Sequence, residues 1–139
     1  MHRGRLLSCN IRELKDTQAT VKMAITRKAI TTPGINWEPR LAPSQGLFYW
    51  YMQNRKRPDW WLDYVIKWKA EKRDNLQYGD AIRYVVSLLN GGLDVAIACF
   101  CTDYNTCHRS IVYAEVEAIM TSFWGDKENI APPPPGLPH

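Results

Sequence analysis

The stretch LDVAIACFCTDYNTCHRS, residues 93–110, decides the fold of this chain. Its first eight residues form a nearly continuous apolar run, bounded by Gly92 and by a polar loop. A short run of this kind is typical of a strand that is buried on both faces, as in a parallel sheet. A helix is expected from about Cys107 onwards, because apolar residues then recur at helical spacing: Ile111, Val112, Val116, Ile119 and Met120.

A second helix is predicted immediately before this strand, over residues 79–90, with Ile82, Val85, Val86 and Leu89 on its buried face. Gly91 is expected to end it in a left-handed conformation. Helix, buried strand and helix together form a parallel α/β unit. The predicted fold class is therefore α/β, a small single domain with a mostly parallel sheet and flanking helices in a Rossmann-like layered arrangement.

The earlier part of the chain supplies further elements. A short strand is expected within RLLSCNIREL (5–14), and the period-2 alternation in ATVKMAITRK (19–28) predicts a half-buried strand. One helix is expected after Pro43 and Ser44, with Ser44 as its cap. Another is expected after Asp59, which would cap it. The second of these carries a basic face that is expected to be solvated: Lys67, Lys69, Lys72 and Arg73.

Composition limits the class of protein. The chain has 139 residues, 45% of them hydrophobic, and a net charge of +4. We expect one domain over residues 1–124 and a proline-rich, flexible tail over 125–139. No apolar run is long enough for a membrane span or a signal peptide, so a cytoplasmic location with reduced thiols is expected and no membrane partner. The sequence leaves the oligomeric state open.

The chemistry-bearing residues gather where the buried strand ends. Cys99, Cys101, Cys107, His108 and Arg109 lie within eleven residues. Ligands of open parallel sheets bind outside the carboxyl ends of the strands, and a helix N-terminus there favours an anion. With Thr106 as the helix cap, Arg109 would clamp a phosphate or carboxylate and His108 would be a second donor.

Two other interpretations compete with the anion site. Cys107 is a candidate nucleophile, since a helix N-terminus and a nearby cation lower the pKa of a thiol. Direct pairing of Cys107 with His108 is not expected, because adjacent residues in a helix point about 100° apart. A zinc site built from Cys101, Cys107 and His108 is the third interpretation, although the spacing is not that of a C-x2-C knuckle. Cys99 is expected to be a core residue.

Several blocks of the sequence resemble the family called domain of unknown function 488. They are Trp37 with the L-A-P-S block at Leu41–Ser44, Trp61 with Tyr64, and the C-x-C and C-H-R motifs of residues 99–109. The resemblance covers residues 35–115 and implies a compact α/β domain with a mostly parallel sheet, without implying an activity. The family's D-x-R motif before the L-A-P-S block is represented here by Arg27 without the aspartate, which favours a binding role.

The leading functional hypothesis is therefore the binding of a small anionic ligand, nucleotide-like or another phosphate ester, at the helix that follows strand 93–100. Arg109 would clamp the anion, with His108 and Ser44 as donors and Tyr104 or Trp37 stacking on a base. The alternatives are a thiol-dependent enzyme that uses Cys107 and a nucleic-acid-associated adaptor. Nucleic acid is not favoured, since the basic residues are not strongly clustered.

Overall fold

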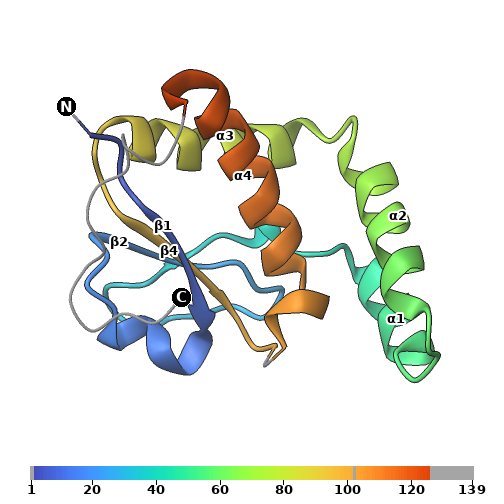
Figure 1. Cartoon of the computed structure of the whole chain (residues 1–139). Helices are drawn as coiled ribbons and strands as arrows, with labels where there is room; N and C mark the ends of the chain where they lie inside the picture. The colour runs from blue at the N-terminus through green and yellow to red at the C-terminus, as the bar shows by residue number, and fades with distance from the viewer. Residues whose placement is uncertain (1, 102, 126–139) are drawn as a thin grey trace.

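The computed structural model describes residues 2–101 and 103–125 and shows a small α/β domain (Figure 1). Its sheet has the strand order β1-β4-β2-β3, formed by Leu6–Asn10, Val95–Cys99, Val21–Ala24 and Asn36–Trp37. All three strand pairings are parallel, in agreement with the predicted fold class. The apolar run of residues 93–100 contains β4, which lies between β1 and β2, and all five of its residues are buried.

The described residues form four α-helices: α1 (Gln45–Asn54), α2 (Trp60–Lys72), α3 (Leu76–Asn90) and α4 (His108–Trp124). Helices α3 and α4 pack on one face of the sheet. The strands turn Leu6, Met23, Val95 and Ile97 to this face, where they join the larger hydrophobic core. In Figure 1, α3 and α4 lie against the sheet, while α1 and α2 stand together to one side of it.

The other face of the sheet has a smaller core. Leu7, Cys9, Ala96 and Ala98 lie there under a 3-10 helix, η1 (Ile11–Asp16), which contributes Leu14. The second strand is more buried than the half-buried strand that was predicted. Val21 and Lys22 are partly buried, whereas Ala24 at the end of β2 and Thr26 just after it are 0% and 3% exposed.

Helix α3 ends at Asn90, as predicted, but the left-handed glycine lies one residue later than expected. Gly91 has a φ of −78°, and Gly92 instead has the left-handed φ of +87°. Gly92 N–H donates to Leu89 O and Leu93 N–H donates to Leu88 O, the pair of bonds of a Schellman motif. Gly91 is thus the C-cap residue and is not left-handed, so that prediction is wrong. The left-handed Gly92 makes the turn that leads into β4.

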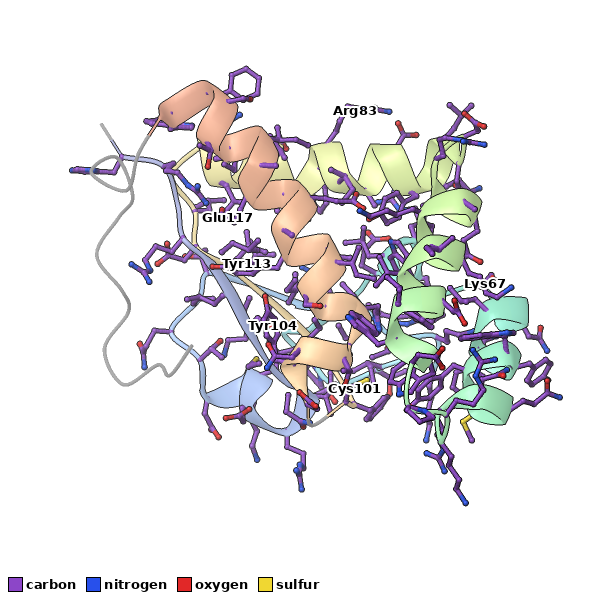
Figure 2. The ribbon with its side chains drawn as sticks, turned by 45° about the vertical axis from the view of Figure 1, so that its right-hand side comes forward. Lys67, Arg83, Cys101, Tyr104, Tyr113 and Glu117 are labelled. Carbon is purple, nitrogen blue, oxygen red and sulfur yellow. The ribbon has the colours of Figure 1, made fainter. Side chains whose placement is uncertain are left out.

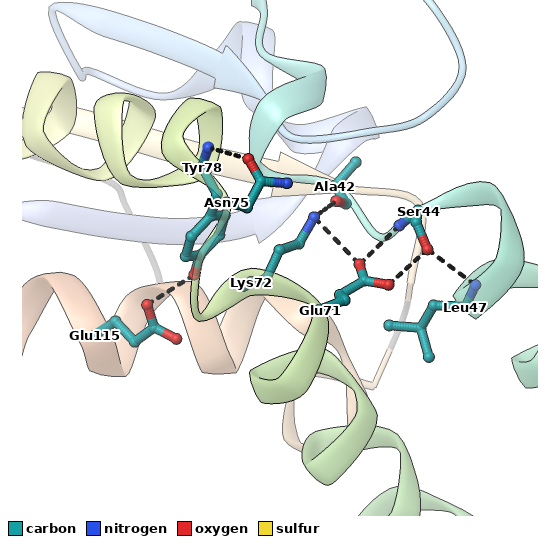
Figure 3. A network of polar contacts seen from close by, with 8 residues as sticks. All are labelled: Ala42, Ser44, Leu47, Glu71, Lys72, Asn75, Tyr78 and Glu115. Carbon is teal, nitrogen blue, oxygen red and sulfur yellow. Dashed lines mark hydrogen bonds and ion pairs between the residues drawn. The ribbon is translucent and has the colours of Figure 1, made fainter.

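The basic face expected on α2 is only partly solvated. Lys72 is 9% exposed, and its ammonium group donates to Ala42 O at 2.7 Å and lies 4.8 Å from the centroid of the Trp68 ring. Figure 3 shows this contact beside Glu71, which forms an ion pair with Lys72 and receives two hydrogen bonds from Ser44. Lys72 is therefore a packing residue that joins the end of α2 to the start of α1.

No helix among the described residues is long and apolar enough to cross a membrane. Helix α4 ends at Gly125, which has a φ of +78°. Apart from this glycine, the predicted tail of residues 125–139 lies outside the part of the chain that the structure describes.

Candidate functional site

The cluster of Cys99, Cys101, Cys107 and His108 lies where β4 ends and α4 begins. Cys107, and not Thr106, is the N-cap residue of α4, with an extended backbone (φ −128°, ψ 143°) and no side-chain capping bond. Thr106 instead is the last residue of a short 3-10 helix, η3 (Tyr104–Thr106), and therefore does not cap α4. Cys107 therefore projects from the loop, while His108 and Arg109 form the first turn of the helix.

Three cysteines and one histidine converge at this point. The sulfur atoms of Cys99 and Cys107 are 2.8 Å apart. The ligand-type atoms of Cys99, Cys101, Cys107 and His108 all lie within 4.8 Å of one another. Cys99 is a core residue, as predicted, with 2% exposure, but its sulfur also belongs to this cluster. The side chain of Cys101 is labelled in Figure 2, below the start of α4.

His108 is fixed in one orientation. Its Nε2 lies 2.7 Å from Ile25 O, a backbone carbonyl that only accepts, so Nε2 carries the proton. Its Nδ1 then lies 3.9 Å from Cys107 Sγ. The expectation that these neighbours cannot pair is wrong, because Cys107 has an extended and not a helical backbone. The His108 ring is also stacked on Trp68, with ring centroids 5.6 Å apart.

The cluster favours one thiolate, at Cys107. Hydrogen bonds from Cys101 and Cys99, then the contact with His108, lower the pKa of Cys107 in spite of its burial. The bond to Cys107 raises the pKa of Cys101 to about 11. Bonds to Cys101 and Cys107 also raise the pKa of Cys99. A thiol that donates to a thiolate is harder to ionise, so the three residues share one negative charge.

Arg109 supplies a positive charge behind this cluster. It is 3% exposed and donates to Ser8 Oγ at 3.3 Å and to Cys101 O at 3.2 Å. Its guanidinium carbon lies 5.6 Å from the centroid of the Tyr104 ring, and its buried Nε has no hydrogen-bond partner. Burial opposes the charge, but the neighbouring cysteines outweigh it and raise the pKa of Arg109.

A pocket with a cavity volume of about 260 Å³ opens above the cysteines. Cys99, Cys101, Cys107 and His108 lie at one end of it. Its charged lining residues are Arg27 and Lys28, which follow β2, and no described acidic residue lines it. Helices α1 and α2 contribute the aromatic wall: Phe48, Tyr51, Trp60 and Tyr64.

A family model described as "Active DUF488-N3 subclade" matches residues 12–119. The chain belongs to the DUF488 family. The match includes the L-A-P-S block, the C-x-C motif and the C-H-R motif, and it confirms the resemblance seen in the sequence. No curated protein and no solved structure matches the chain significantly.

The structure shows what the sequence blocks of this DUF488 protein do in the fold. Ser44, at the end of the L-A-P-S block, caps α1 by accepting a hydrogen bond from Leu47 N–H. Its hydroxyl donates to Glu71, so a carboxylate already occupies this donor. Trp37 donates from Nε1 to Thr26 O at 2.8 Å, which holds β3 against the residues that follow β2.

Not every predicted ligand-binding residue of the DUF488 chain lines the pocket. His108 does, and Pro43 lines it next to Ser44. Arg109, Ser44, Tyr104 and Trp37 are not among the lining residues, so their ligand contacts stay predictions. Tyr104 instead packs edge-to-face on Tyr113, at a centroid distance of 6.3 Å (both labelled in Figure 2).

Arg27 and Lys28 were not predicted to line a ligand pocket, although a signal was present. They are the last two residues of ATVKMAITRK (19–28), where the second strand was predicted, and carboxyl ends of parallel strands meet at one edge of a sheet. This rule places them beside the end of β4. The aromatic wall carried no such signal, because its residues read equally well as core positions of two amphipathic helices.

The cysteine cluster could hold a metal ion. Three sulfur ligands and one imidazole nitrogen form a ligand set suited to tetrahedral coordination. His108 meets the usual outer-sphere condition, since its second nitrogen is held by a backbone carbonyl and Nδ1 is left to coordinate. The predicted trio of Cys101, Cys107 and His108 is brought together, with Cys99 as a fourth member.

Proposed function

We propose that the protein is a thiol-dependent enzyme that binds a small anionic ligand in the pocket and attacks it with Cys107. The observation that carries the proposal is the position of Cys107. It caps a 17-residue helix, faces His108 Nδ1, and lines a pocket whose charged residues are both cationic. A nucleophile beside an oriented base is the usual arrangement for covalent catalysis. The description of the matching subclade as active accords with it.

The chemistry follows from these contacts. Cys107 gives its proton to His108 Nδ1, and the thiolate then forms a bond to the electrophilic atom of the ligand. The leaving group departs with its electron pair and takes the proton back from His108. Arg109 stabilises the thiolate from behind, while Arg27 and Lys28 hold the anionic group. Such chemistry needs reduced thiols, so we place the protein in the cytoplasm.

The test compares two alkylating agents. Iodoacetate carries a carboxylate and iodoacetamide is neutral, so their rate ratio at Cys107 reports both the thiolate and the preference for anions. We expect the rate with iodoacetate to saturate with concentration, and its ratio to iodoacetamide to exceed that of free cysteine. Peptide mass spectrometry gives the rate at each cysteine separately.

Two variants sharpen the experiment. Replacing Arg27 and Lys28 with Gln should lower the iodoacetate rate severalfold and leave the iodoacetamide rate unchanged. The control is Lys15→Gln, which removes an exposed charge from η1, outside the pocket lining. Equal labelling of all four cysteines contradicts the proposal. So does a ratio of iodoacetate to iodoacetamide rates that is unchanged when Arg27 and Lys28 are replaced.

A second candidate function is a zinc centre, and the observation that favours it is the four-residue cluster. Cys99, Cys101, Cys107 and His108 would bind Zn²⁺, with Arg109 offsetting the negative charge of three thiolates. Protein purified without chelators would then retain one zinc per chain by elemental analysis, and alkylation of Cys107 would require prior removal of the metal. If the protein contains no metal when isolated and Cys107 is alkylated rapidly, the thiol enzyme is supported instead.

A further inference from the structure

The aromatic wall of the pocket is held rigidly. The Tyr51 and Trp60 rings meet at 5.1 Å between centroids, with an angle of 60° between their planes. Trp60 and Tyr64 meet at 5.8 Å and 80°, and Tyr51 and Tyr64 at 6.2 Å and 75°. Edge-to-face contacts of this kind fix the planes of all three rings. The wall therefore offers a preformed apolar surface, and Tyr64, at 5% exposure, anchors it in the core.

The cationic residues lie beside this wall. The guanidinium carbon of Arg27 is 5.2 Å from the centroid of the Phe48 ring, which itself lines the pocket. Lys28 follows in the chain and lines the same pocket. Aromatic walls also bind organic cations, but two positive charges with no described acidic residue in the lining disfavour a cation here.

Size sets a further limit. A cavity volume of about 260 Å³ is close to the lower end of the usual range for ligand pockets, about 300 to 1,000 Å³. It suits one ring system with one anionic group. It is too small for a dinucleotide.

We infer that the ligand is a planar aromatic ring that carries an anionic group, with the ring against Tyr51, Trp60 and Tyr64 and the anion at Arg27 and Lys28. This inference rests on the proposed function, in which the pocket binds an anionic ligand and Cys107 attacks it. It assigns the stacking role to the α1–α2 wall, whereas the sequence had suggested Trp37 or Tyr104. A nucleoside monophosphate and a simple aryl phosphate share this chemistry.

The experiment measures protection of Cys107 from iodoacetamide in the reduced, chelator-treated protein. The probes are adenosine 5′-monophosphate, phenyl phosphate, ribose 5-phosphate and adenosine. We expect half-protection by at least one ring-bearing phosphate at about tenfold lower concentration than by ribose 5-phosphate, which corresponds to the lower part of the range for base–aromatic stacking. Adenosine, which has the ring but no anionic group, should also protect less well. Protection by both ring-bearing phosphates indicates a general aryl phosphate site, and protection by adenosine 5′-monophosphate alone indicates a nucleotide site.

A matched pair of variants tests the wall itself. Trp60→Leu should remove the tenfold advantage of the ring-bearing probe and leave protection by ribose 5-phosphate unchanged. Trp61→Leu is the control, since Trp61 stacks on Tyr64 at 5.4 Å and 14° but does not line the pocket. Circular dichroism establishes that both variants are folded.

The outcomes separate the inference from the proposed function. If ribose 5-phosphate protects as well as the ring-bearing phosphates, the ligand does not need an aromatic ring, and only the anion site is supported. The same holds if neither ring-bearing phosphate protects while iodoacetate is still preferred. Tetramethylammonium is added as a cationic probe, and protection of Cys107 by it would show a cation cage and overturn the inference. If no anion protects and iodoacetate has no advantage, the proposed function fails as well.

Discussion

At the scale of single residues, the geometry of the cysteine cluster depends on the backbone conformation of Cys107. Cys107 is extended at the N-cap of α4, and for this reason its sulfur faces both Cys99 and His108 Nδ1. A helical Cys107 would point away from His108. The local 3-10 turn before it therefore sets the chemistry of the site.

The first prediction concerns the pH dependence of thiol labelling. The pKa of Cys107 is lowered, first by the hydrogen bond from Cys101, so its thiolate is present below pH values near 8.5, where an ordinary thiol ionises. We expect its iodoacetamide rate, in reduced and metal-free protein, to be nearly constant between pH 7 and about pH 9. Stopped samples analysed by peptide mass spectrometry give this profile.

The other cysteines are internal references for this experiment. Burial raises the pKa of Cys9 to about 11, and the bond to Cys107 raises that of Cys101 to about 11. Both should label slowly at neutral pH and faster as the pH approaches that value. A Cys107 rate that rises tenfold per pH unit up to pH 8.5 would show an ordinary thiol.

At the scale of elements, the α1–α2 pair is positioned by a polar junction at its base (Figure 3). Lys72 and Glu71 at the end of α2 bind Ala42 O and Ser44 at the start of α1. This junction places the wall of the pocket, because Tyr51 and Tyr64 lie on the two helices that it joins.

The second prediction tests this junction. Lys72→Ala leaves Ala42 O without its donor and removes the packing over Trp68, so the free energy of unfolding should fall by about 1–3 kcal/mol. Urea denaturation followed by fluorescence measures the change. Lys69→Ala is the control on the exposed face of the same helix, and it should stay within about 0.5 kcal/mol. Equal effects would show that the junction does not stabilise the fold.

The third prediction concerns the entry of the chain into β1. Gly4 N–H donates to Leu89 O at 2.7 Å, and a Cβ at Gly4 would lie 1.7 Å from Leu93 O, a backbone atom that cannot rotate away. Gly4→Ala should therefore destabilise the protein by roughly 3 kcal/mol, near the upper end of overpacking costs. A thermal melt of the variant checks this.

Gly46→Ala is the matched control for that substitution. Its Cβ would approach nothing closer than Ser44 Oγ at 4.0 Å, and alanine stabilises a helix relative to glycine by about 0.5–1 kcal/mol. The two substitutions should thus have opposite signs. A neutral Gly4→Ala would mean that β1 does not approach the α3–β4 turn so closely.

At the scale of the whole molecule, the N-terminal segment is tied to the last helix. Arg3 Nη2 lies 2.5 Å from Glu117 Oε2, with side chains 3% and 26% exposed (Glu117 is labelled in Figure 2). This ion pair joins residues 114 positions apart, and it closes α4 over the edge of the sheet next to β1.

The fourth prediction follows from its burial. Glu117→Gln leaves the buried Arg3 charge without a counter-charge, and the free energy of unfolding should fall by roughly 1–3 kcal/mol, less than for a fully buried pair because Glu117 is partly exposed. Asp74→Asn, which breaks an ion pair to Arg73 with side chains 78% and 90% exposed, is the control and should have no measurable effect. If calorimetry gives the two variants comparable losses in the free energy of unfolding, the buried Arg3–Glu117 pair stabilises the fold no more than an exposed pair does.

The amino-acid sequence by itself determined the parallel α/β class, the central strand and the position of the cysteine site after it. These depend on local periodicity, on composition and on the rule that ligands bind where parallel strands end. The positions that it placed wrongly, Gly91, Thr106 and Lys72, differ from the structure by one residue of register or by a contact with another element.

Only the tertiary structure decided which side chains share the pocket. The strand order β1-β4-β2-β3 brings Arg27 and Lys28 next to Cys107. The docking of α1 on α2 turns Tyr51, Trp60 and Tyr64 towards the cysteines. Such neighbours come from strand pairing and helix packing between distant segments, and short-range patterns of hydrophobicity carry no information about them.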